Sequence, residues 1–383
     1  MIPLSVLDLA PVPAGRTVRD ALRNTLDLAR RTEAAGYQRY WLAEHHLASG
    51  VASAAPQILI EAVAAATSRI RVGSGAVQTG HWTPLSIVEQ FGTIDALHPG
   101  RIDLGLGRSG QRRAEAARKA PPPAPARAAE VVDGLLIPAP FDYTRLAAKA
   151  AFGLHGALLQ QPGAETPDFA AVVDDIAALL AGTYARDGQE AHATPGEGAD
   201  LALWILGSSG GQSARVAGAR GLPFAANYHV SPSNVLEAVE AYRAAFRPSD
   251  VLDEPYVLVS ADVVVAPTDE QARELASPYA LWVHSIRSGL AAIPFPTPAQ
   301  AAAHDWRPED RDLVADRVDT QFTGAPGTVV DGLATLQRVT GADELLITTI
   351  THDHADRVRS YELLAAAWHR ATSRVTVPQR ARR

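Results

Sequence analysis

The sequence of 383 residues contains no cysteine. A chain without cysteine forms no disulfide bond, offers no thiolate nucleophile and cannot ligate a metal through sulfur. A reducing compartment is therefore compatible with this chain. Its first residues also lack a basic stretch followed by a small-residue cleavage site, and we expect a cytoplasmic protein.

Long apolar runs and excess positive charge are also lacking. Asp, Arg or Gly interrupts each apolar stretch before it reaches the roughly 20 residues that a membrane span requires. The formal net charge is -7, and the arginine-rich end at 380–383 is too short to attract a polyanion. We therefore expect neither a membrane nor a nucleic acid as partner, and the composition is that of a globular, enzyme-sized chain.

What the sequence does contain is a regular alternation of β-like and helical segments. Helical sequence follows each β-like segment, and the helices with the clearest spacing cover 17–35, 56–67, 84–97, 212–220, 232–246 and 353–368. The predicted strands cover 2–9, 37–43, 70–77, 102–106, 201–206, 223–227, 256–265 and 344–350. Because eight such units close into a ring of parallel strands, we predict an α/β fold, a (β/α)8 TIM barrel.

Two connections are too long for simple loops: 109–200 after the fourth strand and 266–343 after the seventh. In the first insertion we predict helices near 128–137 and over 167–184, with Pro167 in the first helical position. In the second we predict helical sequence around 270–288, and then a proline-rich segment, 293–298, as a lid or a disordered stretch. A single domain over 1–372 is expected, with a tail at 373–383.

Residues 105–110 match the pattern Gly-x-Gly-x-x-Gly, which occurs in dinucleotide-binding folds. That fold also needs a helix directly after the motif and an acidic residue closing a second strand about 20 residues later. Here a proline cluster follows at 121–125, and no strand precedes Glu130. The pattern instead favours a barrel strand whose end presents Arg108 to an anion.

A second glycine-rich segment joins the fifth strand to a helix. It consists of Gly207, Ser208, Ser209, Gly210, Gly211 and Gln212. Unpaired amide groups at a helix start favour an anion, and these small residues leave them accessible. The alternative is a flexible connector. Together with Arg108 on the neighbouring strand, the segment predicts a phosphate site between strands four and five.

Glu44, His45 and His46 end the second strand, where side chains face the barrel mouth. Histidine at this place suits a general acid or base, which we assign to His45, while His46 is interpreted as structural. His352 and His354 follow the eighth strand, and His-x-His at a barrel mouth is also a metal-binding pattern. A metal-dependent TIM-barrel hydrolase is therefore an alternative, although its usual ligands on the first strand are represented here only by Asp8.

Glycines also interrupt the β-branched run at 72–80, and Gly75 is one of them. Such interruptions mark either a bulge against a flat ligand or a corner of the barrel. Taken in order, several segments resemble the bacterial luciferase-like flavin-dependent monooxygenases. These segments are Asp8–Pro13, Tyr40–His46, Arg71–Ala76, Pro99–Arg108, Leu206–Ser209, 341–345 and 360–365.

The resemblance implies reduced FMN, supplied by a separate NAD(P)H:flavin reductase, or the deazaflavin F420 in one branch of the family. It further implies that Arg108 and residues 208–212 hold the flavin phosphate and that Gly75–Ala76 is a non-proline cis peptide beneath the ring. Glu44 is placed in the same cofactor site, and His45 corresponds to the catalytic histidine of the family. A homodimer formed through 56–67 and 84–97 is also implied.

The activity implied is reaction of the reduced flavin with O2 to a C4a-(hydro)peroxyflavin that hydroxylates or epoxidises a small organic substrate. An aromatic natural-product intermediate in antibiotic biosynthesis is one such substrate. An F420-dependent dehydrogenase or reductase on the same fold is the alternative within the family. Luciferases carry a cysteine beside the phosphate arginine where this chain has Gly107, which argues against light emission.

Overall fold

The computed structural model describes residues 2–108, 127–142, 157–161, 163–165 and 167–375. Within these residues, eight parallel strands form a closed ring in the order β10-β11-β12-β14-β1-β2-β3-β5, and β5 pairs with β10 to complete it. The strands are β1 Leu4–Asp8, β2 Arg39–Leu42, β3 Arg71–Ser74, β5 Ile102–Gly107, β10 Ala202–Gly207, β11 Phe224–Asn227, β12 Val257–Val265 and β14 Glu344–Thr348. The predicted (β/α)8 barrel is confirmed.

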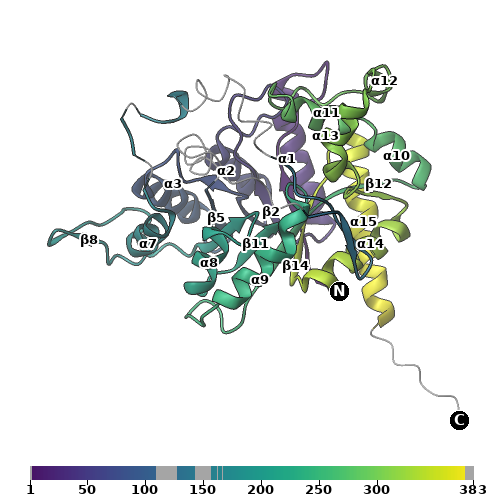
Figure 1. The fold of residues 1–383 in the computed structure, drawn as a ribbon. Coiled ribbons are helices and arrows are strands. Elements are labelled where there is room, and N and C mark those ends of the chain that lie inside the picture. Colours follow the sequence, from purple (N-terminus) through teal and green to yellow (C-terminus); the bar gives the residue numbers. More distant parts are fainter. Residues whose placement is uncertain (1, 109–126, 143–156, 162, 166, 376–383) are drawn as a thin grey trace, which may run out of the picture.

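Helices cover the outside of this ring (Figure 1). Those that follow the strands are α1 Val18–Ala34, α2 Pro56–Ala66, α3 Pro84–Leu97, α7 Phe169–Leu180, α8 Gln212–Ala219, α9 Val235–Ala245, α14 Pro326–Thr340 and α15 His354–Val375. Local sequence explains their starts: Thr17 caps α1 in a capping box with Asp20, and proline opens α2, α3 and α14. No helix in the described part of the chain is long and apolar enough to cross a membrane.

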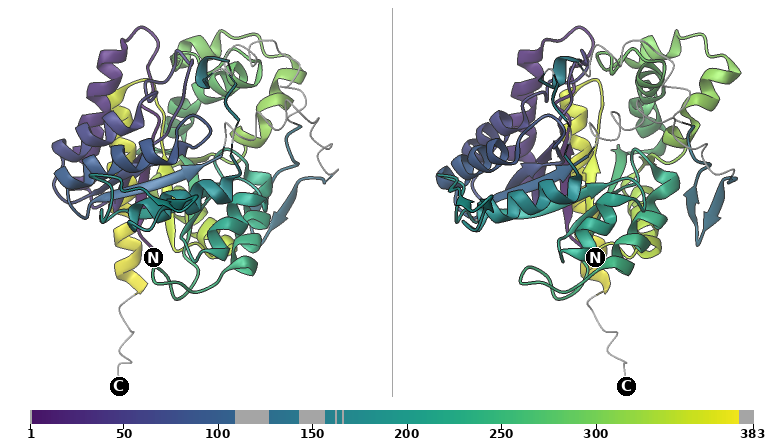
Figure 2. Two further views of the ribbon diagram at one scale, coloured as in Figure 1. Left: turned by 90° about the vertical axis from the view of Figure 1, so that its left-hand side faces the viewer. Right: turned by 60° about the vertical axis from the view of Figure 1, so that its left-hand side comes forward.

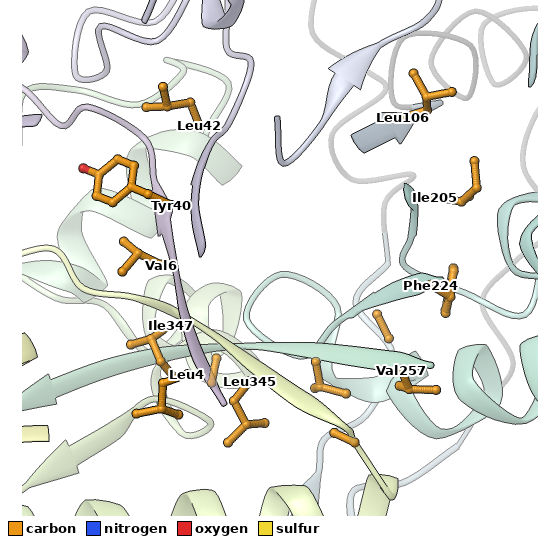
Figure 3. Packing of buried hydrophobic residues seen from close by; sticks show 14 of the residues in the cluster. Leu4, Val6, Tyr40, Leu42, Leu106, Ile205, Phe224, Val257, Leu345 and Ile347 are labelled. Carbon is orange, nitrogen blue, oxygen red and sulfur yellow. The ribbon is translucent and has the colours of Figure 1, made fainter. Parts of the chain in front are cut away.

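Alternation along the strands builds two apolar layers. Side chains such as Val6, Tyr40, Leu106 and Ile347 belong to one cluster with residues of the surrounding helices (Figure 3). The intervening positions fill the barrel itself, and Leu7, Trp41, Trp204, Leu258 and Leu346 are among them.

A charged network lies inside the barrel near the amino ends of the strands. Arg39 bridges Asp103 at 2.8 Å and Glu344 at 3.1 Å, and Arg71 binds Asp103 at 2.7 Å. Tyr256 donates to Glu344 at 2.9 Å. Because every carboxylate here is paired, these buried charges close this end of the barrel without an unpaired ion.

The second insertion supplies helices at the opposite end. They are α10 Asp269–Ala276, α11 Pro278–Arg287, α12 Pro298–Ala302 and α13 Pro308–Val318. Three views place this group at the end of the molecule away from the N-terminus (Figures 1 and 2). Between α11 and α12, the proline-rich segment lacks helix and strand, as predicted, but it is ordered: Phe295 is buried and exchanges backbone hydrogen bonds with Val12 and Ala14.

Three local predictions were wrong. Residues 128–137 form no helix but a hairpin of β6 Glu130–Val132 and β7 Leu135–Ile137, turned by Asp133 and Gly134 at positive φ. The Asp-Gly pair favours this tight turn. Pro167 is not the first residue of α7, because Asp168 is its N-cap. The third strand is also shorter than 70–77, since it ends at Ser74 and resumes as β4 Val77–Gln78.

Shorter elements complete the described chain. They are the hairpin β8 Ala185–Arg186 and β9 Gln189–Glu190, the 3-10 helix Pro232–Asn234 before α9, and β13 Phe322–Gly324, which pairs with β12. The proline cluster at 121–125 and the tail from 376 lie outside the described residues, as do parts of the first insertion.

Candidate functional site

All the predicted site residues lie at the carboxyl ends of barrel strands. Glu44 and His45 follow β2, Gly75 and Ala76 follow β3, and Arg108 follows β5. The segment 207–212 joins β10 to α8. Because the strands are parallel, these residues share one end of the barrel, which is the end that carries the active site in such folds.

The bond between Gly75 and Ala76 is a cis peptide, as the family resemblance predicts. A Cβ atom added to Gly75 would lie 2.7 Å from Leu7 Cδ1 and 3.3 Å from Trp41 Cβ, so a larger residue there would force the Leu7 side chain to shift. A Cβ atom at Gly107 would lie 3.1 Å from the Ala76 Cβ atom. A side chain at Gly107 would therefore crowd Ala76, just beyond the end of β3.

The turn from β10 to α8 depends on glycine in the same way. A Cβ atom at Gly207 would lie 2.9 Å from Ser213 Cβ, and one at Gly210 would lie 2.7 Å from Glu237 Oε1. Gly211 is the N-cap of α8, and it offers no side chain to cap the helix. Within the part of the chain that the structure describes, the first-turn amides of α8 thus have no N-cap side chain as acceptor, which is an arrangement that favours a bound anion.

Asp168 links the turn to Arg108, and the sequence analysis missed this role. Its Oδ2 accepts a hydrogen bond from Gln212 Nε2 at 2.6 Å, while its Oδ1 caps α7 through the amide of Ala170 at 2.9 Å. The hydrogen bond from Gln212, the α7 amides and the charge of Arg108 together hold the pKa of Asp168 below its usual range. Arg108, Asp168 and Gln212 thus lie near one another at the ends of β5 and β10.

This arrangement fits the phosphate of a flavin mononucleotide. A guanidinium, an uncapped helix start and a turn of small residues converge, and each favours a dianion. The prediction that Arg108 and the 207–212 turn would be neighbours is supported by their common link to Asp168. Their contact with a phosphate stays a prediction.

Glu44 is buried and is engaged by the protein itself. Its Oε1 accepts from His46 Nε2 at 2.7 Å and from Trp82 Nε1 at 3.0 Å, and its Oε2 accepts from the amide of Gln78 at 2.7 Å. These bonds fasten the segment between β4 and α3 to the end of β2. The hydrogen bond of His46 agrees with its structural interpretation, and the assignment of Glu44 to the cofactor stays a prediction.

His45 is exposed, and its backbone amide donates to the carbonyl of Ser53 at 3.1 Å. It lies near enough to His229 for the two rings to interact electrostatically. His229 follows β11, and the sequence analysis did not consider it. The signal was available, because His229 comes two residues after the end of a barrel strand, as His45 comes shortly after β2.

The metal ligands of the hydrolase alternative are held apart. His352 Nε2 lies 3.0 Å from the carbonyl oxygen of Ala14, and His354 Nε2 lies 2.9 Å from an oxygen of Asp27. Asp8 pairs with Arg357 at 2.7 Å. Across the residues that the structure describes, no group of three or more His, Asp or Glu side chains is placed to hold a metal ion.

Comparison with known proteins gives a family match over most of the chain. The family model described as luciferase-like monooxygenase matches residues 2–136 and 146–344. The uncharacterized protein YvbT of Bacillus subtilis (strain 168) is 38% identical over 369 residues, covering 95% of this chain and 96% of its own length. A luciferase-like monooxygenase of Escherichia coli (strain K12) is 34% identical, covering 94% of this chain and 96% of its own.

Solved structures show the same fold. Apo-MsnO8 is 31% identical, with a TM-score of 0.75 over 96% of this chain and 98% of its own. The oxygenating constituent of 3,6-diketocamphane monooxygenase from Pseudomonas putida, solved with FMN, has a TM-score of 0.62 at 17% sequence identity. The match covers 95% of this chain and 97% of that protein's chain. A coenzyme F420-dependent tetrahydromethanopterin reductase from Methanopyrus kandleri has a TM-score of 0.59 and 15% sequence identity. The match covers 97% of this chain and 99% of the reductase chain. At these lower identities the likeness concerns the fold.

Proposed function

The chain belongs to the luciferase-like monooxygenase family, and from that membership we propose that it uses reduced FMN and O2 to oxygenate a small organic substrate. The observation that carries the proposal is the convergence of Arg108 with the uncapped start of α8 at the ends of β5 and β10. A phosphate-bearing cofactor such as FMN would be held there by the guanidinium and the helix amides. Hydroxylation and epoxidation are the two outcomes that we propose.

In this proposal Arg108 and the amides of residues 208–212 bind the phosphate, and Asp168 fixes the side chain of Gln212. The small residues Gly75, Ala76 and Gly107 lie close together at the ends of neighbouring strands, and a planar ring could pack against them. Bound reduced FMN supplies the electrons that activate O2.

His45 supplies a proton or a hydrogen bond at the barrel mouth. The residue is exposed at the end of β2, and histidine as a residue type exchanges protons near neutral pH. Helices α10–α13 lie at this end of the barrel and would limit the access of water to the reacting groups (Figure 2).

The proposal extends to partners and location. A separate NAD(P)H:flavin reductase would deliver the reduced flavin, and the chain would act in the cytoplasm, with an aromatic natural-product intermediate as one candidate substrate. A homodimer is supported by apolar side chains that α2 and α3 expose: Ile58 is 71% exposed, Leu85 45% and Leu97 62%. Such side chains gathered on adjacent helices favour contact with a second copy.

The alternative within the fold is an F420-dependent dehydrogenase or reductase. Titration of the purified protein with FMN and with F420, followed by O2 uptake with each reduced cofactor, separates the two. We expect binding of FMN and O2 consumption with reduced FMN. Binding of F420 alone, without O2 consumption, would replace the monooxygenase by the dehydrogenase.

The role of His45 is tested by His45→Ala. This variant is expected to bind FMN as the wild type does but to release hydrogen peroxide faster from reduced FMN and O2. The reason is that the imidazole no longer supplies a proton or a hydrogen bond at the reacting centre. The matched control is His192→Ala, which removes an exposed histidine from the region beyond β9. Unchanged peroxide release in His45→Ala would contradict this role, and stoichiometric zinc with chelator-sensitive, flavin-independent activity would favour the hydrolase.

A further inference from the structure

His229 stands on the opposite side of the barrel mouth from His45. Around the ring, β1, β14 and β12 separate β2 from β11 on one side, and β3, β5 and β10 separate them on the other. The two histidines follow these two opposite strands. A molecule at the centre of the mouth therefore has one histidine on each side.

One ring nitrogen of His229 is fixed to the barrel wall. Nδ1 lies 2.6 Å from Ser260 Oγ, and Ser260 shares the inward face of β12 with Leu258 and Asp262. His229 is 9% exposed. The ring therefore has a defined orientation on the inner side of the mouth.

The surroundings of Ser260 accommodate a ring proton on Nδ1. Besides Nδ1 at 2.6 Å, the hydroxyl oxygen has two carbonyl oxygens near it, those of Ala226 and the Asn227 side chain, both at 3.3 Å. A hydroxyl has one proton to donate, and when a carbonyl oxygen accepts it, the ring donates from Nδ1–H to the hydroxyl. Nε2 is then an acceptor, and a hydrogen bond accepted at Nε2 depends on this tautomer.

The charged surroundings keep this ring neutral. Burial lowers the pKa of His229 to about 3, and the charges of Arg317 and His45 act in the same direction. Arg317 of α13 donates to Tyr279 at 2.7 Å and lies 3.5 Å from Asp262, so the nearest carboxylate is already paired. With its proton on Nδ1, a neutral His229 offers an acceptor at Nε2.

Nε2 has no hydrogen-bond partner among the residues that the structure describes, although Nδ1 has one. From this we infer that His229 is a specificity-determining residue, whose Nε2 accepts a hydrogen bond from a hydroxyl group of the organic substrate, a phenol or an alcohol. The inference rests on the proposed function, and it adds the chemical class of the substrate. A neutral acceptor selects a hydroxyl over an ether because only the hydroxyl donates.

The tautomer is tested first, without any ligand. In protein labelled with 15N in the histidine rings, NMR is expected to show His229 neutral and protonated on Nδ1 between about pH 8 and pH 5. Ser260→Ala removes the acceptor for Nδ1 and is expected to shift the proton toward Nε2. A His229 ring that is charged near neutral pH, or protonated on Nε2 in the wild type, would overturn the inference.

The second test uses phenol and anisole as probes. Anisole carries a methyl group on the oxygen where phenol carries a proton, so only phenol can donate a hydrogen bond. Calorimetry on the FMN-loaded protein and on the protein alone is expected to show phenol bound about tenfold more tightly than anisole, as one hydrogen bond predicts. His229→Asn keeps an amide near Ser260 but loses the acceptor at Nε2, so this preference should disappear. His229→Gln places an amide oxygen near the position of Nε2 and should restore part of it.

A merely structural role would lower the affinity for both probes together, or the thermal stability alone. Equal affinity of the wild type for phenol and anisole, or no binding of phenol, would overturn the inference. Failure of the proposed function has a different signature. In that case FMN does not bind, while the tautomer and the probe preference of the protein without cofactor remain measurable.

Discussion

At the scale of single residues, Arg108 is the side chain that we propose contacts the cofactor phosphate. Arg108→Ala removes one charge-assisted contact to the phosphate and is expected to weaken FMN binding by about 2 kcal/mol, roughly 30-fold. Arg108→Lys keeps the charge but loses the planar donor group. Its FMN affinity should therefore lie between those of the wild type and Arg108→Ala. Fluorescence titration with FMN measures these affinities.

The control for Arg108 is Arg186→Ala, which removes an exposed arginine in the β8–β9 hairpin. Its FMN affinity is expected to equal that of the wild type. If Arg108→Ala also binds FMN as the wild type does, the phosphate lies elsewhere.

The pKa of the buried Asp8 carboxyl group makes the stability of the fold depend on pH. Burial opposes its ionisation, but the Arg357 guanidinium at 2.7 Å and the hydroxyls of Tyr40 and Thr25 more than offset this and lower its pKa. A carboxyl group whose folded pKa lies below its unfolded value of about 3.9 stabilises the fold above about pH 4, and this contribution is lost as the pH falls through the folded pKa.

Two substitutions test this linkage by urea unfolding between about pH 3 and pH 7. Asp8→Asn is expected to lower the free energy of unfolding most at neutral pH, and the difference from the wild type should shrink in acid. Arg357→Met leaves a buried carboxylate without its partner and should cost about 3 kcal/mol or more at pH 7. A pH-independent difference in Asp8→Asn would show that the carboxylate charge does not stabilise the fold.

At the scale of elements, the turn between β10 and α8 sets the position of the helix start. Gly207→Ala puts a Cβ atom 2.9 Å from Ser213 Cβ and 3.0 Å from the Phe224 ring, so α8 must shift. We expect a loss of about 1–3 kcal/mol in stability, as in other overpacked sites, together with weaker FMN binding. Thermal unfolding and FMN titration check both.

Gly327→Ala in α14 is the matched control. Its added Cβ atom has nothing within 4 Å, and alanine in a helix is favoured over glycine by about 0.5–1 kcal/mol. Stability should therefore rise slightly, with FMN affinity unchanged. If Gly207→Ala behaves like this control, close packing does not determine the geometry of the turn.

At the scale of the whole molecule, the two ends of the barrel have different tasks. The amino end is closed by the paired charges of Arg39, Arg71, Asp103 and Glu344. The carboxyl end carries Arg108, His45 and His229 beside the inserted helices. This separation follows from parallel strands, which place every βα connection at one end.

Assembly is the prediction that belongs to this scale. We expect a homodimer through α2 and α3, and Ile58→Glu combined with Leu85→Glu should dissociate it, because each charge would be buried in an apolar contact. Sedimentation velocity measures the change. Val251→Glu, at a position that is 61% exposed between α9 and β12, should leave the dimer intact. A wild-type monomer at micromolar concentration would contradict the dimer itself.

Local sequence determined much of this protein. The helix over Pro84–Leu97 has the predicted ends, because Thr83 and Pro84 start it and neighbouring residues alone decide such a start. Repeated βα units fix the order of the strands, and the parallel arrangement then places Arg108 and the 207–212 turn at one end. The Asp133-Gly134 turn was also encoded locally, although the helical interpretation of that segment overlooked it.

Other features were decided only when the barrel closed. Asp8 meets Arg357 across 349 residues, three donors converge on Glu44, and His229 comes within electrostatic range of His45 although the two follow opposite strands. Local periodicity depends on neighbours within a turn or two of the chain, whereas these contacts depend on the curvature and register of eight strands. The sequence therefore determined which residues reach the mouth of the barrel, and the tertiary structure decided which of them face one another there.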